Sequence, residues 1–290
     1  MRLDEPTRFL PLSLQRHLRA VVVGRRLRRI ARVARGADRL FVRPERNVDH
    51  YYHFLFDLVL PLFCVAADSP RGARFVVERF GPLSDRLDTL LPGRTELVEG
   101  GHDEKEPAID LPGLNSRYTR LEPKAIDAFS RHTAAALGVT LCDEPRDVVL
   151  VERMPPAEYY LTDSARKGGG SHRRAILNHA ELAGAIADSV PAPLVFRNAR
   201  LEELSAAEQY RLFADAAIVI GQHGAGLANC LWCRPGTLLL ELNSTPERIH
   251  FRQLAKTRAM RYSQYTLSTT RAEVDADHFA RWFAVQMKAR

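Results

Sequence analysis

Short apolar runs alternate with segments of helical periodicity along most of the chain. Six runs have the length and composition of buried strands: residues 73–78, 95–101, 147–153, 192–198, 217–221 and 237–242. Between and after them, apolar residues recur at helical spacing in segments 50–68, 80–93, 124–139, 174–188, 205–216, 226–233 and 275–290. Alternating strands and helices predict an open, largely parallel sheet with helices on its faces, so the expected fold class is α/β.

Polar breaks divide this pattern into segments. The stretch over residues 142–147 is polar and contains a proline. We therefore predict an N-terminal α/β domain over residues 1–142, a C-terminal α/β domain over 143–270 and a final helix within 271–290. Within the first domain, residues 1–46 predict short strands, with a helix near Leu14–Ala20.

Two local signals refine the predicted helices. Ser205 is followed three residues later by Glu208, which predicts an N-capped helix with a capping box. Pro61 lies inside the apolar helix over residues 50–68 and predicts a kink there.

Composition indicates a folded chain with a full hydrophobic core. The chain has 290 residues, of which 46% are hydrophobic and 27% charged. No apolar run reaches the roughly 18 to 20 residues of a membrane helix, and the first 20 residues lack the apolar core of a signal peptide. Four cysteines are too few for a disulfide framework. We therefore expect a cytoplasmic protein.

The net charge of +7 is concentrated early, in the arginine-rich segment 24–36. One interpretation is a solvated face without a ligand. The other is attraction to an anionic partner: a phosphorylated ligand, an acidic glycan or an anionic membrane surface. A nucleic-acid partner is not expected, because the segment has no interleaved aromatic residues and the chain has no recognisable nucleic-acid module.

The sequence IGQHGAGLANCLW, residues 220–232, joins a predicted strand to a predicted helix. The carboxyl end of a parallel strand is where open α/β sheets bind ligands. A helix N-terminus offers unpaired N–H groups to a phosphate, and glycines allow a ligand to approach the backbone closely. His223 is placed to bond a phosphate oxygen. The plain alternative is a tight turn with a buried histidine.

Three stretches, in order, resemble the glycosyltransferase 61 family. The first is the N-x-x-H-aromatic helix that contains His53 and Asp57. The second is a strand ending in Arg153 followed by R-x-I-x-N-x-x-E-L. The third runs from Leu204 to Leu242. The family pattern matches this chain at Arg174, Asn178, Glu181, Leu204, Ser205, Glu208, Gln209, Phe213, Ala216, Ile220, Gly221, His223 to Leu227, Asn229, Pro235 to Thr237, Glu241 and Leu242.

This resemblance implies a GT-B-like architecture, in which two Rossmann-like domains face a cleft. The C-terminal half would hold a nucleotide-sugar donor, with a UDP-sugar the first expectation, and the N-terminal half a glycan or lipid-linked glycan acceptor. The donor-site candidates are Arg153, Arg173, Arg174, Asn178, His223, Gly224, Ala225, Gly226, Asn229 and Glu241. Surface salt bridges for the arginines, and a turn cap for Glu241, are the non-functional alternatives.

His53 and Asp57 are the candidate catalytic pair. They lie four residues apart on one helical face, so the carboxylate can orient the imidazole as a general base. Direct attack with inversion, which the resemblance implies, is consistent with either residue as base. The alternative is a histidine merely satisfied by a nearby carboxylate.

No metal and no cofactor are expected. The sequence Asp275-Ala-Asp277 precedes the last predicted helix and is better interpreted as its acidic N-terminal turn than as a metal motif. Cys230 and Cys233 have no second pair, so packing is the preferred interpretation.

The expected function is an inverting glycosyltransferase of bacterial surface polysaccharide biosynthesis, cytoplasmic or peripheral at the inner membrane. The alternatives are a non-catalytic nucleotide- or glycan-binding relative in a polysaccharide assembly complex, and another GT-B-type enzyme such as a pyruvyltransferase-like protein. An enzyme of the latter kind would also place histidine and glycine near a phosphate.

Overall fold

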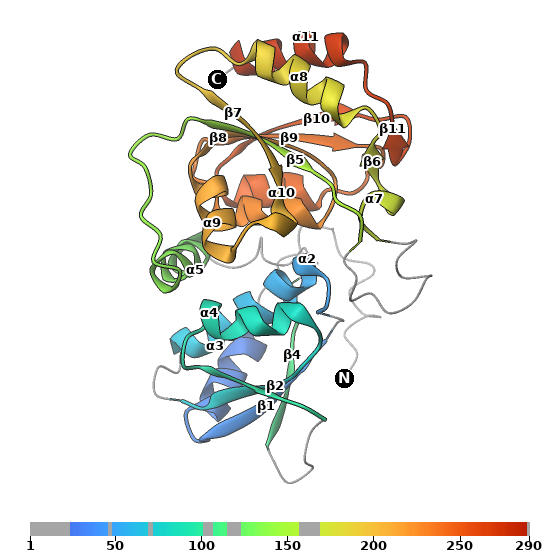
Figure 1. The fold of residues 1–290 in the computed structure, drawn as a ribbon. Helices are drawn as coiled ribbons and strands as arrows, with labels where there is room; N and C mark the ends of the chain where they lie inside the picture. The colour runs from blue at the N-terminus through green and yellow to red at the C-terminus, as the bar shows by residue number, and fades with distance from the viewer. Residues whose placement is uncertain are drawn as a thin grey trace, which may run out of the picture. The chain divides into compact units, whose positions relative to one another are not determined.

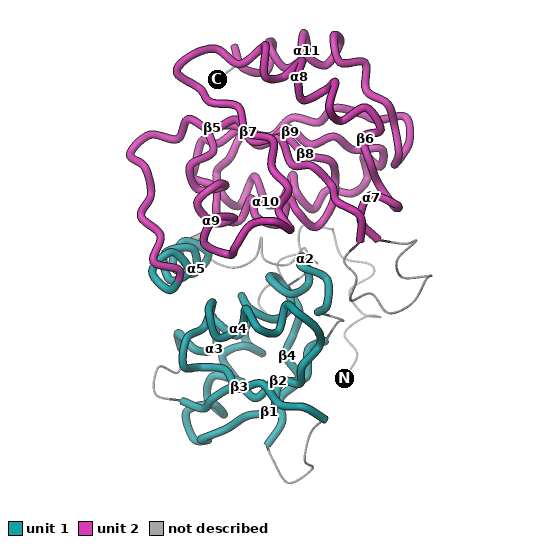
Figure 2. The backbone as a smooth tube through the Cα atoms, viewed as in Figure 1, with its two compact units in different colours: residues 1–136 teal, residues 137–290 magenta. Residues whose placement is uncertain are grey.

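The computed structural model describes residues 24–45, 48–68, 72–100, 107–114, 123–156 and 169–288. The chain divides into two compact units, residues 1–136 and 137–290 (Figure 2). Each unit is built on its own parallel sheet, which confirms the predicted α/β class and its Rossmann-like character. The helix expected near Leu14–Ala20 lies outside the described residues.

The first unit contains a four-stranded parallel sheet in the order β3-β2-β1-β4. Its strands are β1 (Arg39–Pro44), β2 (Arg74–Glu78), β3 (Thr95–Val98) and β4 (Ala108–Leu111). The chain proceeds outward from β1 to β3 and then returns to the other side of β1. The direction of winding therefore reverses between β1 and β4, where open α/β sheets place their ligands.

Residues 24–34 of the first unit are helical. This result corrects the expectation of short strands there. Four apolar side chains of this helix are buried, and they recur at helical spacing: Leu27, Ile30, Ala31 and Ala34. The remaining face carries the arginines of the basic segment, so this segment is an amphipathic helix.

A continuous helix over Tyr51–Asp68 forms much of the first unit's core. It consists of α2 (Tyr51–His53), a π-helical stretch η1 (Phe54–Val59) and α3 (Leu60–Asp68). Every residue of η1 is buried. Pro61 lacks the N–H that would bond the carbonyl of Asp57, and the π-helical turns lie directly before it.

This helix is long and apolar enough to cross a membrane, contrary to the expectation from the sequence. However, 56% of the stretch is buried inside the protein. A core helix of a globular unit has the same length and composition, and its burial favours that role here.

Three shorter elements complete the described part of the first unit: η2 (Pro82–Asp85), α4 (Arg86–Leu90) and α5 (Pro123–Ala136). The single helix predicted over residues 80–93 is therefore a 3₁₀ turn followed by a short α-helix, with Pro82 at its first position.

The second unit contains a five-stranded parallel sheet in the order β10-β9-β8-β5-β7. Its strands are β5 (Asp147–Glu152), β7 (Val195–Arg200), β8 (Ala216–Gln222), β9 (Leu238–Asn243) and β10 (Arg261–Thr266). A separate parallel pair joins β6 (Ala175–Ile176) to β11 (Arg271–Ala272). The winding reverses between β5 and β8, so the carboxyl ends of these two strands form the switch point of this sheet.

Helices cover both faces of this sheet (Figure 1). One face packs against α8 (His179–Ser189) and α11 (Ala276–Lys288), which bury Leu182, Ile186, Phe279 and Phe283 in the core. The other face lies against α9 (Ala206–Ala214) and α10 (His250–Thr257). Shorter elements are α7 (Gly170–Arg173), η4 (Leu201–Glu203) and η5 (Ala225–Trp232).

The predicted helix signals have mixed outcomes. The capping box is confirmed: the Ser205 hydroxyl accepts from the Glu208 N–H at 3.3 Å, and the Glu208 carboxylate accepts from the Ser205 N–H at 2.8 Å. The segment 226–233 is mostly 3₁₀-helix and not α-helix. The helix predicted over 174–188 begins only at His179, because β6 occupies the residues before it.

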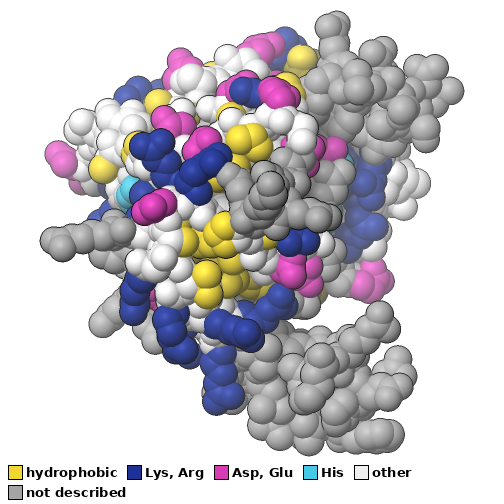
Figure 3. All heavy atoms as spheres, turned by 90° about the horizontal axis from the view of Figure 1, so that it is seen from below, with side chains coloured by type: hydrophobic (Ala, Val, Ile, Leu, Met, Phe, Trp, Pro, Cys, Tyr) yellow, Lys and Arg dark blue, Asp and Glu magenta, His cyan; other side chains and the backbone are white. Residues whose placement is uncertain are grey.

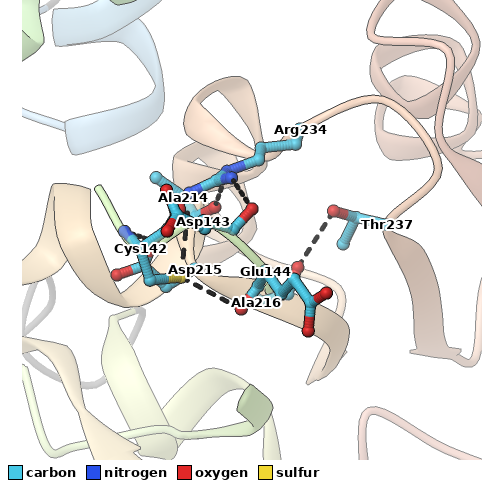
Figure 4. Close-up of polar contacts among 8 residues, drawn as sticks. All are labelled: Cys142, Asp143, Glu144, Ala214, Asp215, Ala216, Arg234 and Thr237. Carbon is cyan, nitrogen blue, oxygen red and sulfur yellow. Dashed lines mark hydrogen bonds and ion pairs between the residues drawn. The ribbon is translucent and has the colours of Figure 1, made fainter. Parts of the chain in front are cut away.

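Arg234 ties together the chain at the amino ends of β5 and β8 (Figure 4). Its guanidinium donates to the Ala214 carbonyl at 2.9 Å and to the Cys142 and Asp143 carbonyls. It also pairs with the Asp215 carboxylate at 3.0 Å. Four acceptors from two separate segments are therefore held by one side chain.

Replacing this side chain, Arg234→Ala, is expected to lower the free energy of unfolding of the second unit by about 2–3 kcal/mol, because charged hydrogen bonds are lost. Both tryptophans, Trp232 and Trp282, belong to this unit, so urea unfolding followed by tryptophan fluorescence reports on it. The exposed Arg211→Ala is the control. Equal stability of both variants would refute the role given to Arg234.

Candidate functional site

The switch point of the second sheet brings together two residues predicted from separate motifs. Arg153 directly follows β5, and His223 directly follows β8. Because these strands are adjacent and parallel, with Val151 opposite Gly221, their carboxyl ends lie at one edge of the sheet. This is the position that ligands occupy in open α/β sheets.

His223 is held by a buried carboxylate. Its Nδ1 lies 2.5 Å from Oε1 of Glu241, the residue paired beside Gly221 on the next strand. The other oxygen of Glu241 accepts from the Tyr262 hydroxyl at 2.6 Å. Glu241 is fully buried and His223 is only 6% exposed. Phe251 of α10 packs edge-on against the imidazole at 5.1 Å. The nitrogen of His223 that remains for a ligand is therefore Nε2.

The glycines of this motif make room for close packing. A Cβ atom on Gly224 would lie 1.8 Å from Nη1 of Arg153, and one on Gly221 would lie 2.7 Å from the Leu227 side chain. Neither position tolerates a side chain without displacement of its neighbour. Gly224 thus allows the Arg153 guanidinium to lie directly against the turn that carries His223.

Arg153 also fixes the segment around α7. Its Nε donates to the Arg174 carbonyl at 3.1 Å, and its Nη2 donates to the Gly170 carbonyl at 3.2 Å. Gly170 has a φ of 48°, in the left-handed region that favours glycine. A Cβ there would also lie 2.6 Å from the Met154 carbonyl oxygen. Arg153 therefore positions the chain that leads into Arg173 and Arg174.

Arg174 lies within a cluster of positive charges. It is only 9% exposed, and its guanidinium has no hydrogen bond or ion pair among the described residues. Burial lowers the pKa of Arg174 to about 10, and the nearby charges of Arg173, Arg248 and Arg153 act in the same direction. Glu241 acts in the opposite direction. Several donors and a net positive potential thus gather at this sheet edge.

The two predicted asparagines are engaged within the fold. Asn178 bonds the backbone of Val274 twice, at 2.8 and 2.9 Å, and so joins the start of α8 to the chain after β11. Asn229 donates to the Gly226 carbonyl at 3.3 Å and accepts from the Trp232 indole at 3.1 Å. These contacts shape the chain around the arginine cluster, and donor contacts of Asn178 and Asn229 stay a prediction.

The first unit has its own histidine–carboxylate pair. Nδ1 of His53 lies 2.6 Å from Oδ2 of Asp57, with the side chain of His53 29% exposed and that of Asp57 fully buried. Gly113 follows β4, at the switch point of that sheet, and a Cβ there would lie 2.6 Å from Asp57. The N–H of Leu114 bonds the Phe56 carbonyl at 3.0 Å. The pair is therefore fixed beside the carboxyl end of β4.

Sequence reasoning missed Arg248 and Tyr262. Arg248 lies between β9 and α10, after the carboxyl end of a parallel strand, which is the signal that would have identified it. Tyr262 is the second residue of β10, the strand next to β9, and reaches Glu241 only because the two strands pair. Among the described residues, no three His, Cys, Asp or Glu side chains are grouped as a metal site. The metal-independence of the site stays a prediction.

Comparison with known proteins gives the family. Residues 51–240 match the family described as Glycosyltransferase 61. A stretch of 80 residues is 36% identical to a protein named Beta-1,2-xylosyltransferase from Arabidopsis thaliana. That match covers 27% of this chain and 15% of the plant protein. The matched range contains His53, Asp57, the arginines at 153, 173 and 174, and His223. The chain belongs to the glycosyltransferase 61 family.

Proposed function

We propose that this protein is an inverting glycosyltransferase that transfers a sugar from a nucleotide-sugar donor to a hydroxyl of a glycan acceptor. The observation that carries the proposal is Arg174: a mostly buried guanidinium, without a partner among the described residues, beside three further arginines. Such a cluster is stabilised by a multiply charged anion, and a nucleoside diphosphate supplies one. Family membership supports the same class of ligand.

The arginine cluster and His223 are proposed to stabilise the leaving group. As the bond between the sugar and the diphosphate breaks, negative charge grows on the β-phosphate oxygen. Arg174 and Arg173 would neutralise that charge, and Nε2 of His223 would donate a hydrogen bond to it when the ring is protonated. In this proposal, protein cations perform the task that a metal performs in other transferases, and no metal or cofactor is required.

His53 and Asp57 are proposed to activate the acceptor. With Nδ1 bound to Asp57, Nε2 of His53 accepts the proton of the acceptor hydroxyl, and the imidazolium that forms is stabilised by the carboxylate. The acceptor oxygen bonds to the anomeric carbon as the diphosphate leaves from the opposite side. One bond forms and one breaks in a single displacement, so the anomeric configuration is inverted.

This chemistry requires both units, and we propose a GT-B arrangement in which the two sheets' switch points face one cleft. The donor is proposed to be a UDP-sugar, and the acceptor a glycan or lipid-linked glycan of a bacterial surface polysaccharide. The protein would act in the cytoplasm, at the inner face of the membrane. The non-catalytic relative and the pyruvyltransferase-like enzyme are the competing candidates.

The helix over residues 24–34 is proposed to contact the anionic membrane surface. Its exposed face carries Arg25, Arg26, Arg28, Arg29 and Arg32. Among the described residues, none of these guanidinium groups is in an ion pair. Lys and Arg side chains are also grouped in the view from below (Figure 3). An unpaired basic helix of this kind is attracted to anionic lipids by about 1 kcal/mol per arginine.

The first test is isothermal titration with UDP, GDP and CMP. One nucleoside diphosphate is expected to bind, and Arg174→Gln and His223→Ala should each weaken binding by about tenfold or more. Gly224→Ala should have a similar effect, because its Cβ takes the place of the Arg153 guanidinium. The control is Arg197→Gln, at the amino end of the same sheet and paired with Asp147. Unchanged affinity in Arg174→Gln would refute the proposed site.

Removal of the catalytic pair should separate binding from transfer. His53→Ala and Asp57→Asn are expected to lower the transfer rate by about 10²–10⁴-fold while the nucleotide affinity stays the same. The control is His132→Gln, because His132 in the same unit bonds the Leu90 carbonyl. If the wild-type protein binds nucleotide and turns over no donor, the non-catalytic relative is the better interpretation. Full transfer activity in both variants would show that neither His53 nor Asp57 is the catalytic base.

Membrane contact is testable by sedimentation with lipid vesicles. The protein should co-sediment with phosphatidylglycerol vesicles and not with phosphatidylcholine vesicles, and less so as salt is raised. Changing the five helix arginines to glutamine should abolish this binding. A charge-matched control changes five exposed arginines of the second unit: Arg197, Arg200, Arg211, Arg271 and Arg281. If both variants lose vesicle binding equally, the binding depends on the net charge of the protein and not on this helix.

A further inference from the structure

Tyr262 has no role in the chemistry proposed above, yet it closes a chain of hydrogen bonds that begins at His223. Its hydroxyl donates to Oε2 of Glu241 at 2.6 Å, and Oε1 of the same carboxylate binds Nδ1 of His223 at 2.5 Å. The three residues lie on β10, on β9 and directly after β8. Three adjacent parallel strands therefore each contribute one member.

Each contact in this chain restricts the next one. A fully buried carboxylate with one bound oxygen can still rotate about its last torsion, whereas one bound at both oxygens is fixed. Fixing the carboxylate keeps Nδ1 of His223 as the nitrogen that donates to Glu241, so a second proton on the ring is carried by Nε2 and faces the ligand. The backbone N–H of His223 bonds the Leu242 carbonyl at 2.9 Å, which holds the main chain in register with β9.

The Tyr262 hydroxyl acts as a donor over the whole range in which enzymes work. Burial, and then its hydrogen bond to Glu241, raises the pKa of Tyr262 above its usual range. A second acceptor, Oε1 of Gln264, lies at the longer distance of 3.1 Å. The carboxylate is the closer and charged acceptor, so it receives the proton.

We propose that Tyr262 is a positioning residue: through Glu241 it holds the imidazole of His223 with Nδ1 bound and Nε2 directed to the ligand. Glu241, which the sequence indicated as a ligand contact, then acts through His223. This inference rests on the proposed nucleotide site, because the ring is oriented for a ligand bound there. It makes the orientation of His223 depend on a residue of β10, a strand that contains none of the site residues predicted from the sequence.

The same strand offers a matched control. Tyr265 is three residues further along β10, and its hydroxyl bonds Nδ1 of His278 at 2.8 Å. Its ring packs against Phe279 and Trp282 of α11. Tyr265 is thus a second hydrogen-bonded tyrosine on β10, and its hydroxyl is directed toward α11 and away from Glu241.

The test compares Tyr262→Phe with Tyr265→Phe by nitrogen-15 NMR of the histidine rings and by nucleotide titration. The wild-type protein should show a far-downfield Nδ1 proton signal of His223 that is lost in His223→Ala, and with nucleotide bound the ring should carry a proton on Nε2 as well. Tyr262→Phe should shift or lose this signal and weaken nucleotide binding by about tenfold, while Tyr265→Phe changes neither. An unchanged His223 signal in Tyr262→Phe would overturn the proposal.

Two further outcomes keep this inference distinct from the proposed function. If no nucleotide binds to any variant, the proposed function fails, while the NMR signals still report whether Tyr262 orients His223. If Tyr262→Phe does not fold, the histidine NMR spectrum of the wild-type protein becomes the test of the positioning role. A His223 ring without the downfield Nδ1 proton would then refute the positioning role.

Discussion

A buried guanidinium without an ion-pair partner is the constraint on which the second unit depends. Removing the charge of Arg174 from water costs free energy, and the like charges of Arg153, Arg173 and Arg248 add to that cost. No ion pair of Arg174 among the described residues offsets it. Rigid geometry holds these charges together in spite of that cost. Parallel strands end at one edge, glycines leave space, and two carbonyls accept hydrogen bonds from Arg153. An anion bound at this edge would remove the repulsion, so the charges at this edge favour anion binding before any specific contact is counted.

The two units contain the same local arrangement, for which we propose two different roles. In each, Nδ1 of a histidine is bound by a fully buried carboxylate next to a sheet's switch point: His53 with Asp57, and His223 with Glu241. The surroundings separate their roles. The electrostatic neighbours of Glu241 include Arg174, a member of the positive cluster, which suits His223 to a phosphate. His53 is more exposed than His223 and lies on a π-helical turn, which suits proton exchange with an acceptor hydroxyl.

Most of the strands and helices that carry the site could be predicted from the sequence, because their signals lie within short stretches of the chain. Strands β5, β8 and β9 are continuous apolar runs because both faces of their sheet are covered, and the capping box of α9 needs only four residues. Arg248 and Tyr262 could not be predicted in the same way, because their importance comes from strand order. Nothing within the chain near Tyr262 indicates that β10 pairs with β9 and so places a hydroxyl on Glu241. The short strands predicted for the basic segment are wrong for residues 24–34, because the many arginines there hide the helical spacing of Leu27, Ile30 and Ala34.

Arg153 and Arg174 differ as probes of the site, although both match the family pattern. Arg153 uses two nitrogens to hold the carbonyls of Gly170 and Arg174, and the third lies against Gly224. Its removal would therefore release the segment that carries Arg173 and Arg174, as well as one positive charge. Arg174 has no such structural contact among the described residues. A loss of affinity on changing Arg174 measures the ligand's charge, whereas a loss on changing Arg153 combines that charge with the position of α7. Arg174 is consequently the residue on which the assignment of the anion site depends.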